Sequence, residues 1–273
     1  MYTLSFSGAG HLLPYHLGVA TRLLPHRHRL LAVAGSSSGA VAATVLALVP
    51  HRLEDYAERF LRDRGRAFRN LEQLLVEEQL ERKSMNDTNL QLSICTTQCS
   101  DGKMRLHTFG AEQALSEHPS GVLKAIQASC AIPRSFHPFS DMFSRQPLSY
   151  PDEEGIEIDG ACYVDGGIAA PVPPTMLDRD PQCLGRIEVS PIFGPNTEVS
   201  VPVLPIRPRD HSISLPFTLT TTRCQPFGIR PSLQNLRALV VAAGLAKPAV
   251  LRDWYQRGMD DASRFVEEQW GTK

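Results

Sequence analysis

The sequence has no hydrophobic stretch long enough to span a bilayer. A membrane-spanning helix needs about 18 apolar residues in a row, and no part of the 273 residues reaches that length. A signal peptide is not expected either, because residues 2–6 already have the length and composition of a first strand. We therefore expect an intracellular protein that meets a membrane, if at all, from its cytoplasmic face and without a transmembrane segment.

A large excess of charge of either sign is also missing. The chain has 28 Lys and Arg residues against 29 Asp and Glu residues, which leaves a net charge of −1. Proteins that bind nucleic acid carry a basic surface, so no nucleic acid partner is expected. Hydrophobic residues make up 42% of the chain, which is enough for a sizeable core and excludes a disordered protein.

The cysteines follow neither a disulfide framework nor a metal-binding pattern. They are scattered along the chain at Cys95, Cys99, Cys130, Cys162, Cys183 and Cys224. One pair is four residues apart, but no second pair with ligand spacing follows. We expect all six to be reduced, mostly buried side chains, and we expect no metal and no organic cofactor.

Three serines between two glycines stand where an apolar strand meets an apolar helix. Residues 30–34 have strand length and residues 40–49 have helix length, and Gly35 to Gly39 separate them. A G-x-S-x-G sequence in this setting is typical of a nucleophile elbow, with Ser37 at the apex of a tight turn. A flexible linker has a similar composition, but linkers have polar flanks. The apolar flanks therefore favour the elbow.

A pair of glycines follows the first expected strand. Residues 2–7 form that strand, Gly8 and Gly10 follow, and an apolar helix is expected over residues 13–24. Glycines here leave backbone N–H groups open to a ligand. A dinucleotide-binding turn is not indicated, because Leu13 replaces the third glycine of that motif. An ordinary strand-to-helix turn remains the other interpretation.

The order of the expected elements predicts an α/β fold. Strands alternate with helices, which indicates a mostly parallel central sheet with helices on both faces. Further strands are expected over 90–94, 104–109, 156–164 and 185–193, and further helices over 51–83, 120–131, 233–246 and 249–266. The proline-rich stretch 195–231 has no clear periodicity, and we expect it to wrap the surface.

The three motifs are expected to meet at one edge of this sheet. Gly8, Ser37 and Asp165 each follow an expected strand, and ligands bind at the carboxyl ends of strands in such sheets. Serine needs a base within reach and donors for the oxyanion that it creates. Asp165 can act as that base or orient one, although an Asp-Gly-Gly is more often a simple turn.

In the combination of these motifs, the chain resembles the patatin-like phospholipase family, in its adiponutrin-type branch. The likeness extends over roughly residues 2–175, and its specificity comes from the combination of segments. The matching segments are residues 4–10, 15–19, 35–40, 128–133 and 164–167. We accordingly divide the chain into a patatin-like catalytic core, residues 1–175, and a remainder of the same domain, residues 176–273, that wraps and closes it.

The resemblance implies a serine acylhydrolase that cleaves acyl esters of glycerolipids, either triacylglycerol or phospholipid. It assigns Ser37 as the nucleophile and Asp165 as the base, in a dyad without histidine that works through an acyl-enzyme. It also implies these supporting residues: an oxyanion hole of Gly8, Ala9 and Gly10, elbow glycines Gly35 and Gly39, and Gly166 and Gly167 after the aspartate. The expected partner is a lipid substrate at a membrane or lipid-droplet surface, and protein partners are not indicated.

Two other interpretations remain open from the sequence. One is an α/β-hydrolase esterase with a Ser-Asp-His triad, in which His211 would be the histidine because it is the only one after Asp165. The other is a catalytically silent lipid-binding domain, in which Leu13 has altered the oxyanion loop. Four arginines in residues 62–69 could also form a membrane-facing patch, but a solvated helix surface is the favoured interpretation.

Overall fold

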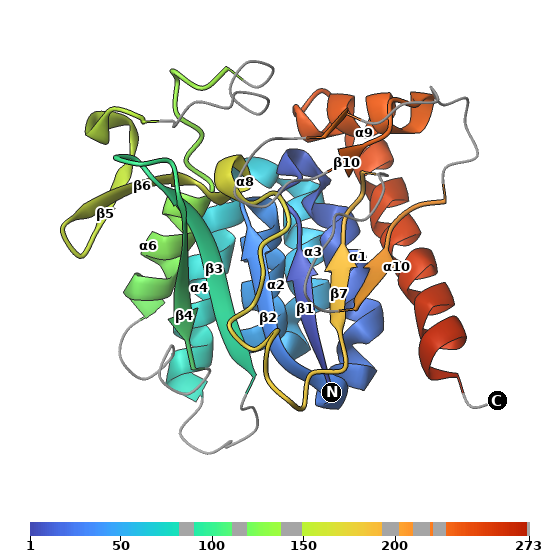
Figure 1. The fold of residues 1–273 in the computed structure, drawn as a ribbon. Coiled ribbons are helices and arrows are strands. Elements are labelled where there is room, and N and C mark those ends of the chain that lie inside the picture. Colours follow the sequence, from blue (N-terminus) through green and yellow to red (C-terminus); the bar gives the residue numbers. More distant parts are fainter. Residues whose placement is uncertain are drawn as a thin grey trace.

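A mixed eight-stranded sheet forms the centre of the computed structural model, which describes residues 1–81, 90–110, 119–137, 149–192, 202–209, 219–220 and 228–271 (Figure 1). The strands of this sheet are β1 (Tyr2–Phe6), β2 (Leu30–Ser36), β3 (Gln91–Gln98), β4 (Met104–Phe109), β5 (Ile156–Ile158), β6 (Ala161–Asp165), β7 (Arg186–Val189) and β8 (Val203–Ile206). A separate pair consists of β9 (Leu219–Thr220) and β10 (Gly228–Ile229).

Helices flank the sheet, and most of those described stand behind it in the view of Figure 1. They are α1 (Leu13–Leu23), α2 (Ser38–Leu48), α3 (Leu53–Arg62), α4 (Ala67–Glu81), α6 (Pro119–Ser129), α8 (Gly166–Ala169), α9 (Leu233–Ala242) and α10 (Pro248–Trp270). The short helix α9 lies across the top of the molecule in this view, near the carboxyl ends of β1 and β2. Among the described residues, no helix is long and apolar enough to cross a membrane.

The central strands run parallel, in the order β3-β2-β1-β7-β8, and antiparallel strands extend the sheet on one side. There β4 and β6 both pair with β3, and β5 pairs with β6. The first strand is central, because Leu4 lies opposite Val33 on one side and Ile187 on the other. The predicted α/β class is confirmed, and the carboxyl ends of β1, β2 and β7 meet at one edge.

Two expectations for the strands need correction. Residues 156–164 form the hairpin β5–β6 rather than one strand, because Asp159 and Gly160 both have positive φ angles, 50° and 78°, and reverse the chain. The proline-rich stretch also contains the regular strand β8, which pairs with β7. Pro205 lies within β8, and an edge strand tolerates proline because one side needs no backbone donor.

Candidate active site

Ser37 is held in a strained turn between β2 and α2. Its φ and ψ are 51° and −129°, a conformation that residues with a side chain rarely adopt. The turn depends on both flanking glycines, since a Cβ on Gly35 would collide with the Gly39 carbonyl, and one on Gly39 with the Phe6 carbonyl. The strand–turn–helix geometry predicted for the elbow is therefore present, with the serine side chain at the end of β2.

A second serine, Ser129 at the end of α6, links the elbow to the sheet by hydrogen bonds. The Ser37 N–H donates to Ser129 Oγ at 2.8 Å, and that hydroxyl donates to the Cys95 carbonyl of β3 at 2.6 Å. Ser129 is fully buried. The sequence shows Ser129 only as part of the matching segment 128–133, so its contact with the elbow could not be predicted without the structure.

Asp165 lies buried at the end of β6, with 5% of its surface exposed. Its backbone is fixed by two contacts, from its N–H to the Ala131 carbonyl at 2.9 Å and from Thr97 Oγ1 to its own carbonyl at 2.7 Å. Oδ1 of its carboxyl group accepts the Gly167 N–H at 2.8 Å. The other oxygen, Oδ2, is buried without a hydrogen-bond partner among the described residues.

Burial raises the pKa of the Asp165 carboxyl to about 6. The Ser37 side chain and the Gly167 amide both favour the charged form and offset part of this rise in pKa. A carboxylate with this pKa is still mostly ionised at neutral pH, yet it accepts a proton more readily than an exposed aspartate does. Asp165 therefore has the protonation state and the raised basicity that a catalytic base requires.

The glycine loop after β1 offers fewer free amides than the sequence suggested. The Gly8 N–H donates to the Pro171 carbonyl at 2.8 Å, and the Ala9 N–H donates to Ser38 Oγ at 3.1 Å. Within the described chain, the Gly10 N–H has no acceptor, and its φ of 52° suits glycine. Gly10 and the N-terminal amides of α2 are thus the backbone donors left for an oxyanion.

Leu13, which replaces an expected glycine, does not disturb this loop. It begins α1 with φ −42° and ψ −40°, an ordinary helical conformation, and its side chain is 2% exposed. The close contacts lie elsewhere, because a Cβ on Gly10 would be only 2.5 Å from the Ala242 carbonyl of α9. The end of α9 therefore packs directly onto the loop.

Two apolar pockets open at Ser37. The first, of about 290 Å³, contains Asp165 and the glycine loop. Its apolar wall is formed by Ile132, Phe136, Ile168, Ile192, Ile229 and Leu239. The second, of about 510 Å³, is lined by Leu13, Val41, Phe60, Phe68, Arg64 and His11. Since both include Ser37 and the exposed Ile132, a forked apolar ligand fits around the serine.

No histidine in the described residues hydrogen-bonds to Ser37 or Asp165. His16 is fully buried, and burial lowers its pKa to about 3, so it is uncharged. His11 lines the second pocket, and burial and the Arg64 charge lower its pKa. His211, the histidine of the triad interpretation, lies outside the described residues. Among those residues there is also no cluster of His, Cys, Asp and Glu that could hold a metal ion.

Comparison with known proteins identifies similar chains. A family model for patatin-like phospholipases matches residues 4–178. Mouse patatin-like phospholipase domain-containing protein 2 is 28% identical over 97% of this chain. The chain spans only 50% of the length of that protein. Human patatin-like phospholipase domain-containing protein 4 is 25% identical, over 98% of this chain and 97% of its own. The crystal structure of VipD from Legionella pneumophila aligns with a TM-score of 0.47 and 13% identity, covering 98% of this chain and 67% of VipD.

Proposed function

Because the chain belongs to the patatin-like phospholipase family, whose members are lipid acyl hydrolases, we propose that it cleaves acyl esters of glycerolipids with a Ser37–Asp165 dyad. One observation carries the proposal. Ser37, in its strained turn, and the buried Asp165, with one carboxylate oxygen unpaired, line the same apolar pocket. The raised pKa of Asp165 makes it the base for this serine without a histidine.

The reaction follows from the positions of these groups. Asp165 takes the hydroxyl proton of Ser37 as the serine oxygen attacks the ester carbonyl. The oxyanion that forms accepts the Gly10 N–H and faces the positive end of α2. Asp165 then returns the proton to the departing alcohol, and the acyl group remains on Ser37. Water, deprotonated by Asp165, releases the fatty acid and restores the serine.

Arg64 favours a glycerolipid with an anionic group over triacylglycerol. It lines the second pocket beside Ser37, and its guanidinium donates a hydrogen bond to the Ala246 carbonyl at 3.3 Å. Its neighbour Arg66 is paired with Asp63 at 3.1 Å, whereas no described carboxylate pairs with Arg64. A phosphodiester on the glycerol backbone would supply the missing negative charge.

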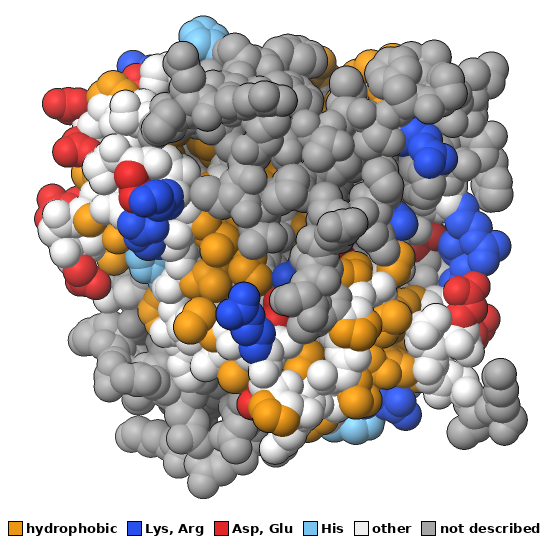
Figure 2. Space-filling model, in the orientation of Figure 1, with side chains coloured by type: hydrophobic (Ala, Val, Ile, Leu, Met, Phe, Trp, Pro, Cys, Tyr) orange, Lys and Arg blue, Asp and Glu red, His pale blue; other side chains and the backbone are white. Residues whose placement is uncertain are grey.

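We also propose that the enzyme works at a lipid surface, on a membrane or a lipid droplet, from the cytoplasmic side. The pockets open among exposed apolar side chains, with Ile132 65% exposed and Leu239 46% exposed. Other exposed apolar residues follow on and after α9: Leu233, Leu236, Val240 and Leu245. Acidic side chains gather instead at the left of Figure 2, over β5 and the turn Asp152–Glu154. We propose further that the chain falls in the adiponutrin-type branch of the family that its residues 4–178 match.

Labelling with a fluorophosphonate probe tests the dyad proposal directly. The probe forms a covalent bond only with an activated serine, so it reports the nucleophile, its base and the oxyanion donors together. We expect the wild-type protein to be labelled and to hydrolyse a lipid ester, and Ser37→Ala to do neither while unfolding at the same temperature. Unlabelled wild-type protein would indicate a silent lipid-binding domain, and labelled Ser37→Ala would place the nucleophile elsewhere.

A further inference from the structure

One large pocket lies apart from Ser37, between α9 and α10. It has a volume of about 590 Å³, within the usual range of roughly 300–1,000 Å³ for sites that bind small molecules. The apolar side chains that line it are Leu236, Val240, Val241, Leu245, Val250 and Trp254. Neither Ser37 nor Asp165 reaches it, so the proposed reaction does not use this space.

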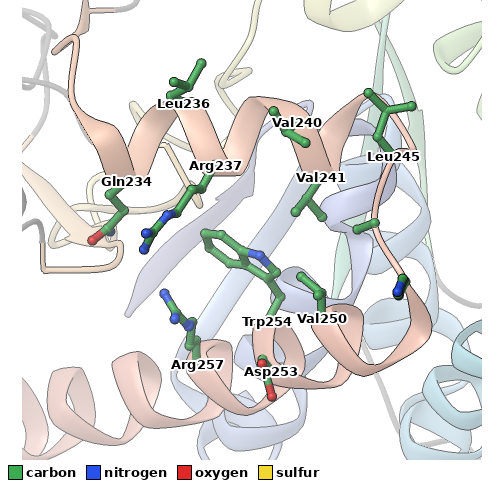
Figure 3. A pocket seen from close by; sticks show the side chains of 12 residues that line it. Gln234, Leu236, Arg237, Val240, Val241, Leu245, Val250, Asp253, Trp254 and Arg257 are labelled. Carbon is green, nitrogen blue, oxygen red and sulfur yellow. The ribbon is translucent and has the colours of Figure 1, made fainter.

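Two arginines converge at one end of this pocket. Figure 3 shows Arg237 of α9 and Arg257 of α10 extending toward one another beside the Trp254 ring. The guanidinium carbon of Arg257 lies 5.2 Å from the centre of that ring. Neither arginine forms an ion pair with a described carboxylate, and Asp253 points away from both in Figure 3. Two cations therefore face each other, and no carboxylate of the described residues pairs with either of them.

We propose that this pocket binds a single-chain anionic amphiphile, a long-chain fatty acid, with its carboxylate between Arg237 and Arg257. A guanidinium group presents two parallel N–H donors that match a carboxylate, and two such groups can hold one carboxylate from both sides. The acyl chain would cover Trp254 and the exposed Val240 and Leu245, whose exposed fractions are 45% and 77%. The choice of a fatty acid rests on the proposed function, because a fatty acid is its product.

Helix α9 forms a wall of both this pocket and the pockets at Ser37. Val240 and Val241 face the α9–α10 pocket, whereas Leu239 and Ala242 line the pocket that contains Asp165. The Ala242 carbonyl also packs onto Gly10, whose amide is the free oxyanion donor. A bound fatty acid would therefore contact the same helix that shapes the active site.

Titration of the Ser37→Ala variant with monomeric oleate in a calorimeter tests the site without turnover. We expect Arg237→Gln and Arg257→Gln each to weaken oleate binding by about tenfold or more, as for the loss of a charge-assisted contact. Arg252→Gln, an equally exposed change on α10 outside the pocket, should bind oleate like the parent. Oleyl alcohol, with the same chain and no charge, should bind more weakly, and its affinity should be the same in all three variants.

Two outcomes would overturn this proposal. One is unchanged oleate affinity in both arginine variants, and the other is oleyl alcohol binding as tightly as oleate. A second control distinguishes oleate bound at the Ser37 pockets from oleate bound between the two arginines. Wild-type protein whose Ser37 carries a long-chain phosphonate has its Ser37 pockets filled, and it should still bind oleate in a way that depends on the arginines. If Ser37 proves unreactive, the proposed function fails, whereas the titrations with Ser37→Ala still decide whether this site exists.

Discussion

At the scale of single residues, Asp165 combines a buried carboxyl group with an unpaired oxygen. An unpaired polar atom in a protein interior costs stability, so such atoms often mark a functional site. Burial is also the main cause of its raised pKa. The groups that stabilise its charge, Ser37 and Gly167, lie within the motifs that the sequence singled out. The same environment thus disfavours the carboxylate and makes it a stronger base.

Replacing Asp165 with asparagine isolates proton transfer, because the amide keeps the shape of the side chain and lacks its basicity. We expect Asp165→Asn to lower kcat by about 10²- to 10⁴-fold, the usual effect of losing a general base. Wild-type activity should fall as the pH drops below about 6, where the base becomes protonated. His211→Ala should keep most activity, and equal losses in the two variants would favour the triad.

Measuring the free energy of unfolding tests whether Asp165→Asn loses its activity because it unfolds. Because the pKa of Asp165 is raised from 3.8 to about 6, the folded protein holds a proton between these pH values that the unfolded chain releases. The contribution of Asp165 to stability is therefore present below about pH 4 and is lost as the pH rises through 6, at a cost of about 3 kcal/mol. Asp165→Asn should be the more stable protein at pH 7.

Arg64 allows a prediction about substrate choice. We expect Arg64→Gln to reduce kcat/KM for phospholipid vesicles by about tenfold, since a charge-assisted contact to the phosphate is lost. Hydrolysis of an uncharged short-chain ester should change less than about twofold. Arg66→Gln removes the same charge from the same basic run, but Arg66 is exposed and paired with Asp63, so this control should retain both activities. Equal effects of Arg64→Gln on both substrates would contradict the assignment.

Much of the site could be predicted from the sequence, because its strained parts need particular residues in a fixed order. A tight turn is predicted from Gly35, Ser37 and Gly39 because an apolar strand precedes them and an apolar helix follows them. The engagement of the Ala9 amide by Ser38 could not be predicted, since a side-chain contact across the sheet edge leaves no periodic signal. The sequence could equally not show which of the three loop amides remain free.

At the scale of elements, helices α1 and α10 pack against each other through glycines. A Cβ on Gly18 would collide with the Tyr255 carbonyl, and one on Gly258 would collide with the Tyr15 carbonyl. The backbones therefore approach more closely than side chains would allow, and Tyr15 reaches across to Asp261 with a hydrogen bond of 2.9 Å. Long apolar periodicity predicted both helices, but the sequence alone did not reveal this contact between their backbones.

Substituting these glycines separates helix propensity from packing. Alanine is favoured over glycine in a helix by about 1 kcal/mol, yet we expect Gly258→Ala to lower the free energy of unfolding by roughly 2 kcal/mol because the helices must separate. Gly121→Ala in α6 is the matched control, since its Cβ would meet only Phe109 at 4.0 Å, and it should be neutral or stabilising. Urea unfolding measures both, and a stabilised Gly258→Ala would contradict the close packing.

At the scale of the whole molecule, we propose that residues 1–175 and 176–273 form one domain. Strands β7 and β8 complete the sheet beside β1, and α10 packs along α1. A buried hydrogen bond joins the two parts, because Thr3 Oγ1 donates at 2.7 Å to the carboxylate of Asp178, which also pairs with Arg186 at 2.7 Å. The residues that matched the family, 4–178, therefore end before the sheet does.

Truncation tests this proposal. We expect a chain that ends at residue 178 to lose cooperative unfolding, because β1 would lose its neighbour β7 and Asp178 would lose Arg186. A chain lacking only residues 272–273 is the control and should unfold like the full chain. Thermal unfolding followed by circular dichroism distinguishes the two, and a sharp transition in the 178-residue chain would mean that the catalytic core folds alone.

The central position of β1 also determines when the protein can finish folding during its synthesis. Strand β1 leaves the ribosome shortly before Leu30 to Gly35, its partner on one side, whereas its partner on the other side starts only at Arg186. Until then one edge of β1 offers its backbone groups to any passing strand. Such distant pairings also slow folding, so we expect the nascent chain to be prone to aggregation until β7 has been made.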